Sequence, residues 1–329
     1  MVRKIFAALL LLLTLVIAAC GEQPEKKEQK NLVLYSQLEQ GFTEALLSSY
    51  AETNTGLKLT AIYELKPESV KPDIILAERN VLLDLRGSNA LQAIVSDVGD
   101  RLPVKFKDDK GFWYGVFYDP TVFLINQQYA RTVGQEKLRS WSDLEYNKDD
   151  LRITMENLSS SDSSINFLTS LASNLGESKT LNYLWNINRH IEQYAKFPFT
   201  PIRMAAVGDA DIAITKQSFV SKYLENNFPA YVIYPKEGTP INLYGGAVYK
   251  ECTNPQAATK FINWLIADEA VKYVSQTIDT GYMFLLPQGI NGSAANPEFL
   301  WLNTSYLSKE QQDALISNWL ENVRFNKNN

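Results

Sequence analysis

The sequence predicts an α/β protein of two lobes, each a mixed, mostly parallel sheet flanked by helices. Strand patterns alternate with helix patterns along the chain, as parallel βαβ units require. Two extended segments, at 112–129 and 242–250, interrupt this alternation and are interpreted as crossings between the lobes. The 329 residues are enough for two domains of ordinary size. Because open α/β sheets bind ligands beyond the carboxyl ends of their strands, we expect a ligand cleft between the lobes.

The N-terminus predicts an export signal and a tether, both outside the fold. A basic start is followed by an apolar run of about fifteen residues, which is short for a membrane-spanning helix. The run ends in small residues directly before Cys20, which resembles a bacterial lipoprotein signal at 1–19 with Cys20 as the lipidated first residue. Residues 20–30 are charged and lack large apolar side chains, so they are expected to be a flexible tether. The alternative is an ordinary signal peptide with a chance cysteine.

Lobe 1 is expected to begin with a strand, a helix and two further strands. Phe42, Leu46 and Tyr50 recur at helical spacing, and Gly56 is expected to stop this helix. The last of the strands is continuous in apolar residues, as expected of a parallel strand covered on both faces. The predicted elements are strands at 31–36, 57–63 and 72–77 and a helix at 40–56.

The aromatic segment at 112–129 is predicted to carry the chain into lobe 2. Pro120 lies in its middle, and since proline is disfavoured in a central strand, the segment must bend or follow an edge there. The predicted elements that follow are strands at 153–157, within 207–219, at 231–235 and at 242–250, helices at 165–176 and 180–194, a helix pair at 254–276 and a helix at 308–323 capped by Ser308.

These elements divide the chain into parts. Lobe 1 is expected to comprise 31–118 and 244–290, with lobe 2 at 119–243 between them. Residues 291–329 are expected to form a C-terminal helical segment that packs on lobe 2.

Charge and cysteine content exclude some partners. Without residues 1–19 the chain has 30 basic and 37 acidic side chains, a net charge of −7, and no basic block. Because phosphate contacts need clustered Lys and Arg, we expect no nucleic-acid partner. Beyond Cys20 the sequence has only Cys252, so no intramolecular disulfide can form between the remaining cysteines.

Four stretches carry a family resemblance: LVLYSQLEQGFTEALLSSYAETNTGLKL, PDIILAERNVLLDL, GDADIAI and GGAVYKECTNPQAATKFINWLIADEA. In this order they resemble extracellular solute-binding proteins of ABC importers, the periplasmic binding proteins of type 2. The subgroup is the one that contains ferric-iron, thiamine, phosphonate and sugar-phosphate binders. The resemblance spans nearly all of 31–324. It implies a two-lobed fold that closes on its ligand by hinge motion and then docks on a membrane permease.

Two carboxylates follow strands that should end at the same edge of the sheet. Glu39 comes after the first strand, and Glu78 follows the third, with Arg79 beside it. In the ferric-binding members a histidine matches Glu39 and a glutamate matches Glu78. The two acids and Arg79 are therefore candidate ligand-binding residues, and the alternative is that the acids are solvated loop residues.

The stretch VGDADIAITKQSF bears on the ligand. Ferric-binding members have two adjacent tyrosines after this strand, and alignment through GDADIAI brings Ser218 and Phe219 to those positions. The chain contains no adjacent Tyr-Tyr pair, so the resemblance argues against iron held by tyrosinates. Ser218 and Phe219 remain candidate cleft residues, and the alternative for Phe219 is a position in the core.

Two helix starts and two tyrosines complete the candidate set. Ser163 and Ser164 open a helix whose N–H groups and dipole suit an anion, unless Asp162 or Ser163 merely caps it. Arg203 is expected in the first turn of a helix capped by Thr200. Aromatic faces suit cations and planar rings, and the tyrosines nearest the predicted crossings or strand ends include Tyr244 and Tyr282.

We therefore predict a monomeric solute-binding lipoprotein outside the cytoplasm, anchored to the membrane surface by lipid, partnered by an ABC permease, with neither cofactor nor resident metal. Its ligand is expected to be a small polar organic ion, such as an amine-bearing, phosphonate, phosphate or thiamine-like molecule. Ferric iron held by carboxylates and a synergistic anion is one alternative. A hydrolase that uses Glu39 and Glu78 is another alternative. The sequence has a single His and no P-loop, GxGxxG or GxSxG motif, so we expect that the protein is not an enzyme.

Overall fold

The computed structural model describes residues 30–63, 66–133, 138–145, 150–224, 228–267, 270, 281–285, 296–304 and 307–326. The predicted signal at 1–19, Cys20 and all but the last residue of the predicted tether lie outside these ranges. So does most of the second helix predicted within 254–276. Among the described residues, no helix has both the length and the apolar character needed to span a bilayer.

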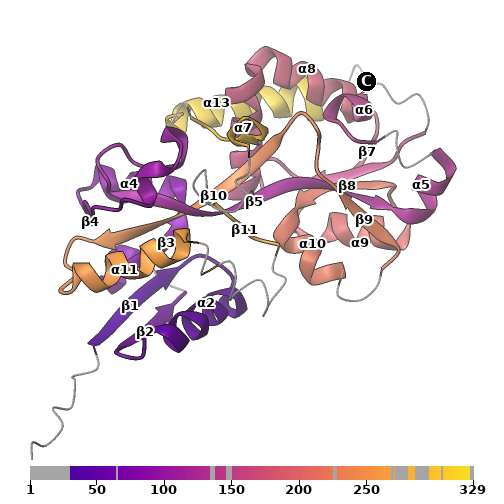
Figure 1. Cartoon of the computed structure of the whole chain (residues 1–329). Helices are drawn as coiled ribbons and strands as arrows, with labels where there is room; N and C mark the ends of the chain where they lie inside the picture. The colour runs from indigo at the N-terminus through magenta and orange to yellow at the C-terminus, as the bar shows by residue number, and fades with distance from the viewer. Residues whose placement is uncertain are drawn as a thin grey trace, which may run out of the picture.

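The first lobe is a sheet in the order β2–β1–β3–β10–β5 (Figure 1). β1 pairs in parallel with both β2 and β3, and β10 pairs antiparallel with β3 and β5, so the sheet is mixed. Its strands are β1 (Lys30–Ser36), β2 (Leu57–Ile62), β3 (Ile74–Glu78), β4 (Leu91–Gln92), β11 (Met283–Phe284) and parts of β5 (Trp113–Asn126) and β10 (Thr239–Tyr249). The helices are α2 (Gln40–Thr53), α3 (Pro67–Val70), α4 (Arg79–Gly87), η1 (Gly99–Arg101), η2 (Val104–Phe106) and α11 (Pro255–Ile266).

The second lobe continues the sheet through β5–β8–β6–β7, with β9 also paired to β5. β6 is parallel to β7 and β8, whereas β5 is antiparallel to β8. Its strands are β6 (Ile153–Glu156), β7 (Ile191–Ala195), β8 (Ile212–Lys216) and β9 (Ala230–Ile233). The helices are α5 (Gln127–Val133), α6 (Trp141–Glu145), α7 (Asp162–Leu175), α8 (Glu177–Asn188), α9 (Phe199–Val207) and α10 (Gln217–Leu224).

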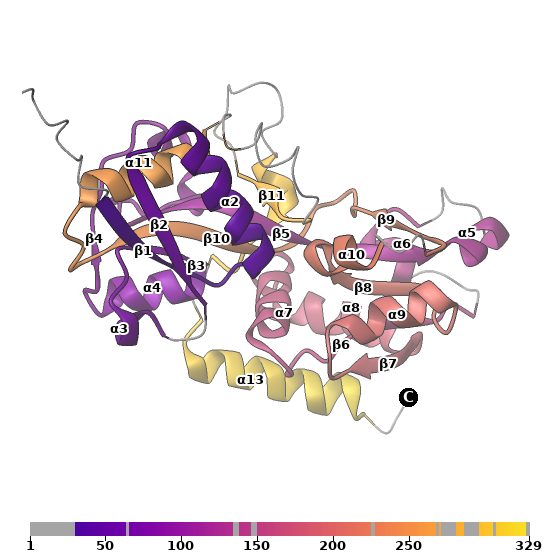
Figure 2. The same cartoon turned by 90° about the horizontal axis from the view of Figure 1, so that it is seen from below.

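β5 and β10 are the two crossings, and both run from one lobe into the other (Figure 2). Pro120 lies opposite Ile241 of β10, at the point where β5 changes partners: from Thr121 onward it pairs with β8. One large core contains side chains of β1, β3 and the first half of β5, and another contains those of β6, α7 and α8. The protein therefore has the predicted two-lobed α/β fold.

The C-terminal part consists of η4 (Pro297–Phe299), β12 (Leu300–Trp301), α13 (Lys309–Trp319) and a π-helical turn, η5 (Leu320–Arg324). The predicted cap at Ser308 is confirmed. Its side chain accepts a hydrogen bond from the Gln311 amide, and the Gln311 side chain accepts one from the Ser308 amide. α13 packs against α7 and α8, and Figure 2 shows it lying along one side of the molecule.

Three local predictions were wrong. The helix predicted at 180–194 ends at Asn188, and residues 191–195 form β7, because pairing with β6 outweighs the local helical pattern. Thr200 is not a cap, since α9 begins at Phe199, and Arg203 therefore lies just beyond its first turn. The cap of α7 is Ser161 rather than Asp162 or Ser163.

Candidate functional site

The carboxyl ends of β3, β6 and β8 meet where the two crossings pass between the lobes. Glu78, Glu156 and Lys216 are the last residues of these strands. In each strand the residues before this last position are buried and mostly apolar. The three charged side chains therefore lie together at one edge of the sheet. Asp119 of β5 and Asn242 of β10 come from the crossings and are almost fully buried. The cluster thus joins charged groups of both lobes.

Asn242 is the centre of this cluster because it uses both ends of its amide. Its Oδ1 accepts hydrogen bonds from Lys216 Nζ at 2.7 Å and Asn166 Nδ2 at 2.8 Å. Its Nδ2 donates to Glu78 Oε1 and to Ser163 Oγ, both at 3.0 Å. One crossing side chain therefore links Glu78 of the first lobe to α7 and β8 of the second.

Glu78 lies between neutral donors and a nearby positive charge. Besides Asn242, the Tyr244 hydroxyl donates to its Oε1 at 3.3 Å. Burial raises the pKa of the Glu78 carboxyl, although the charge of Lys216 and these two hydrogen bonds act in the opposite direction. The same burial raises the pKa of Tyr244 well above its ordinary value, so this phenol remains a donor.

The predicted residue Ser218 hydrogen-bonds to the buried carboxylate of Asp119. The Ser218 amide donates to Asp119 Oδ1 at 3.0 Å, and its hydroxyl donates to Oδ2 at 2.6 Å. Burial raises the pKa of Asp119, while Lys216 and the hydrogen bonds from Ser218 lower it. The hydroxyl of Ser218, which lies at the start of α10, therefore already donates to a carboxylate of β5.

Lys216 is a buried ammonium with hydrogen-bonding capacity left over. Only 7% of the residue is exposed, and its hydrogen bond to Asn242 uses one of three donors. In the described part of the chain, no carboxylate oxygen lies within 4.0 Å of its nitrogen. Burial lowers the pKa of Lys216, and the more distant charges of Asp119, Glu78 and Glu156 oppose this change.

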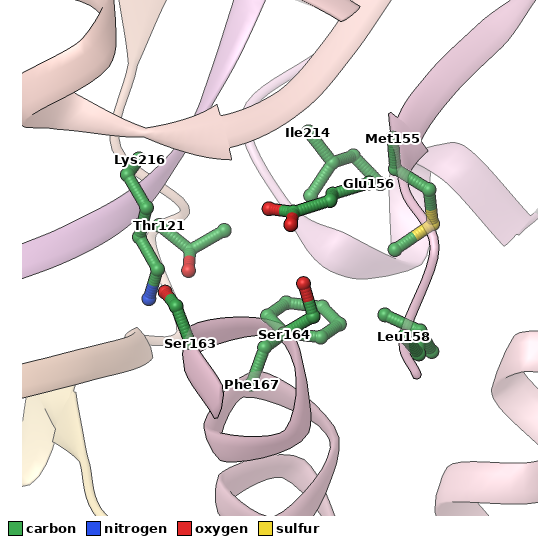
Figure 3. A pocket seen from close by; sticks show the side chains of 9 residues that line it. All are labelled: Thr121, Met155, Glu156, Leu158, Ser163, Ser164, Phe167, Ile214 and Lys216. Atoms are coloured by element: carbon green, nitrogen blue, oxygen red, sulfur yellow. The ribbon is translucent and has the colours of Figure 1, made fainter. Parts of the chain in front are cut away.

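Lys216 reaches a small cavity at the start of α7 (Figure 3). The Glu156 carboxylate and the Ser164 hydroxyl point into the same space, and the Lys216 nitrogen lies beside Ser163. The cavity measures about 30 Å³, which is room for about two water molecules. It is lined by Thr121, Met155, Glu156, Leu158, Ser163, Ser164, Phe167, Ile214 and Lys216.

Serines hold Glu156 in place at this cavity. The hydroxyls of Ser160 and Ser161 each donate to Glu156 Oε1 at 2.9 Å. Ser161 also accepts the Ser164 amide at 3.1 Å and so caps α7. The cap and the orientation of the carboxylate therefore depend on the same hydroxyl.

A larger cavity of about 660 Å³ opens between the lobes on the other side of this helix start. Its walls come from β3 and α4 of the first lobe, α7 of the second, and the first turn of α13. Four carboxylates and one ammonium line it, so its charge is predominantly negative. These charged residues are Glu78, Asp84, Asp162, Glu310 and Lys309.

Two further predicted residues, Tyr282 and Glu39, lie on the first-lobe side near Tyr244. Tyr244 contacts Tyr282 edge to face with ring centroids 5.6 Å apart, and Tyr282 stacks on Phe42 at 5.0 Å. Glu39 is half-buried at the N-cap position of α2, and its charge is one of those that raise the pKa of Tyr282, after burial. These oxygen-bearing side chains form one group on the first-lobe side.

Of the ten predicted residues, Ser163 and Ser164 line the small cavity and Glu78 lines the larger one, whereas three others are positioned elsewhere. Arg79 Nη1 donates to the carbonyl oxygen of Asn303 at 3.0 Å. Arg203 is exposed on α9, and Phe219 packs against Phe199 with centroids 5.2 Å apart. Whether any of the ten candidate residues contacts a ligand stays a prediction.

Sequence reasoning missed Asp119, Glu156, Lys216 and Asn242. A charged residue inside or directly after a buried apolar strand, as at Asp119 and Lys216, is costly and therefore informative, and that signal was available. Asn242 carries no such signal. In the described residues there is no group of three or more His, Cys, Asp and Glu side chains arranged for a metal ion.

Comparison with known proteins gives a family match and distant relatives. A family model described as "Bacterial extracellular solute-binding protein" matches residues 69–310. The chain is 23% identical to iron uptake protein A1 of Synechocystis, over 89% of this chain and 90% of that protein. It is 24% identical to an uncharacterized Haemophilus influenzae protein, over 62% of this chain and only 61% of that protein.

Solved structures share the fold. AfuA of Actinobacillus pleuropneumoniae, a periplasmic binding protein with exogenous fructose-6-phosphate bound, has a TM-score of 0.63 and 19% identity, covering 91% of this chain and all of that one. The Trichodesmium protein FutA, in complex with iron and citrate, has a TM-score of 0.68 and 20% identity, covering 88% and 98%. At these identities the likeness shows the fold alone.

Proposed function

The chain belongs to the bacterial extracellular solute-binding protein family, and we propose that its cleft captures a small polar organic ion that carries both an anionic and a cationic group. As a member of this family it is a solute-binding protein and not an enzyme, and we propose that it delivers its solute to the permease of an ABC importer. The arguments below concern the chemistry of that solute.

Opposite charges around the small cavity support this ligand class. A buried ammonium without a carboxylate in contact has lost its hydration without full electrostatic compensation. An anionic ligand group would provide that compensation. Lys216, Ser163 and the first turn of α7 offer such a group donors and a positive dipole end. Glu156 lies at the same cavity, and Glu78 lines the larger acidic one on the other side of the start of α7, so a cationic group finds carboxylates on both sides of this helix start.

A thermal-shift screen followed by calorimetry tests the proposal. Aminoalkylphosphonates, amino-sugar phosphates, thiamine and neutral sugars would be compared, since a ligand that binds only the native state raises the melting temperature. We expect a molecule with both charges to give the largest shift. Lys216→Met should then abolish its binding, whereas the exposed Lys179→Met should not. Equal affinity for a neutral analogue, unaffected by Lys216→Met, would contradict the proposal.

Ferric iron is a second candidate, supported by the name of one relative and by the oxygens of Glu39, Glu78, Tyr244 and Tyr282 on the first-lobe side. The positive charge of Lys216 close to Glu78 opposes it, because a trivalent cation would be repelled. Titration with ferric citrate decides between the two. A visible absorption band from tyrosinate coordination that disappears in Tyr244→Phe would favour iron.

We also propose that residues 1–19 are removed and that lipidated Cys20 anchors the protein to a membrane surface. The apolar run and the small residues before Cys20 support this. In cells, Cys20→Ser should move the protein from the membrane fraction to the soluble or secreted fraction. Cys252→Ser, which changes the chain's other cysteine, should leave it at the membrane. Membrane retention of Cys20→Ser would refute lipid anchoring.

A further inference from the structure

Residues 297–304 are built into both hydrophobic cores. Leu300 and Leu302 belong to the core of the first lobe, whereas Trp301 between them belongs to the core of the second. This follows from the extended backbone, in which successive side chains point to opposite sides. Trp301 stacks on Trp141 of α6 with ring centroids 6.4 Å apart. Three consecutive residues thus insert alternately into the two lobes.

Hydrogen bonds fasten this segment to both lobes as well. On the first-lobe side, Lys105 of η2 donates to the carbonyl oxygen of Leu300 at 2.9 Å and also to that of Pro297. Arg79 of α4 donates to the carbonyl oxygen of Asn303. On the second-lobe side, Asn174 Nδ2 of α7 donates to the carbonyl oxygen of Leu302 at 3.1 Å.

The absence of a side chain at Gly238 leaves room for the indole ring of Trp301. Gly238 has φ +105°, in the region that favours glycine, and a Cβ there would lie 2.6 Å from Trp301 Nε1 and 2.8 Å from the Phe299 Cα. The Gly238 carbonyl oxygen accepts the Trp141 indole N–H at 2.8 Å. Directly after it, β10 pairs in parallel with β12. The insertion is therefore a specific fit and not an incidental contact of a chain terminus.

We infer that residues 297–304 form a strap, a third connection between the lobes that restrains hinge opening. β5 and β10 are adjacent strands, so they alone can act as a single flexible ribbon between two bodies. A third attachment beside that ribbon resists separation of the lobes on its own side. Opening there would require either release of the hydrogen bonds of Lys105 and Arg79 or exposure of Leu300, Trp301 or Leu302. This inference is independent of the ligand proposed above.

Two lysines of neighbouring positions provide a matched test. Lys105→Met removes the bonds to the strap, whereas Lys107→Met removes only contacts with Asp100 of the same lobe. Small-angle X-ray scattering of the full-length, ligand-free protein should give a larger radius of gyration for Lys105→Met than for wild type or Lys107→Met. Hydrogen exchange of the amides at 300–302 should become about tenfold faster in Lys105→Met alone, as loss of a charge-assisted hydrogen bond predicts.

A second variant keeps the inference testable if Lys105→Met does not fold. Asn174→Ala loosens the strap from the second-lobe side, and it should increase the radius of gyration in the same direction as Lys105→Met. Circular dichroism confirms that each variant is folded. Faster exchange at 300–302 with an unchanged radius of gyration in both variants would overturn the inference, because the segment would then be fastened without restraining the hinge.

Discussion

At the scale of single residues, Asn242 is central to the cleft because, among the described residues, it is the side chain that hydrogen-bonds to both Glu78 and Lys216. We expect Asn242→Ala to lower the free energy of unfolding by about 1 to 3 kcal/mol, since it leaves buried polar groups without partners. Urea unfolding measures this. Asn186→Ala removes a single side-chain hydrogen bond, to Glu145, at an exposed position and should change stability by much less. Equal effects of the two substitutions would contradict the central role of Asn242.

The raised pKa of Glu78 predicts a pH dependence of stability. Burial shifts the folded-state pKa above the ordinary carboxyl value of about 4.5, so the folded protein binds a proton more tightly than the unfolded chain. Wild type should therefore lose stability relative to Glu78→Gln as the pH rises from about 4.5 through the folded-state pKa. Urea midpoints measured between acidic and neutral pH test this. Glu52→Gln, which removes a carboxylate at an exposed position on α2, is the matched control.

At the scale of elements, one hydroxyl at the start of α7, that of Ser161, both caps the helix and contacts the carboxylate that we propose as part of the binding site. Ser161→Ala should lower stability by about 1 kcal/mol, the usual cost of losing a helix cap. It should also weaken binding of a cationic ligand group, because Ser161 orients Glu156. Asn254 caps α11 away from both cavities, so Asn254→Ala should lower stability without changing affinity. Calorimetry and thermal unfolding of both variants separate these effects.

The elements also mark how far the sequence could lead. Local patterns predicted the strand–helix alternation, both crossings and the Ser308 cap, because these depend on residues close together in the chain. β7 was missed because its strand pairing is a tertiary contact. The partners of Asn242 come from β3, α7 and β8, so no local spacing could have predicted the cluster. Ser218 was placed near the correct strand end, but its bond to Asp119 required the register between β5 and β8.

At the scale of the whole molecule, the strap and the cleft should be coupled through the hinge. Glu78 and Ser163 reach Asn242 from different lobes, so the cluster is complete only when the lobes are close together. If only this arrangement binds the solute fully, the apparent dissociation constant increases in inverse proportion to its population in the free protein. Lys105→Met should then weaken binding although Lys105 lines neither cavity described above.

This coupling makes a quantitative prediction. Calorimetry gives the factor by which Lys105→Met raises the dissociation constant of the best ligand from the screen. Scattering gives the factor by which the same substitution lowers the population of the closed form. The two factors should be equal. Lys107→Met should change neither quantity. A rise in the dissociation constant without a fall in the closed population would mean that Lys105 acts on the ligand by another route. When the cleft is saturated with ligand, wild type and Lys105→Met should have the same radius of gyration, because binding favours the closed form of both proteins.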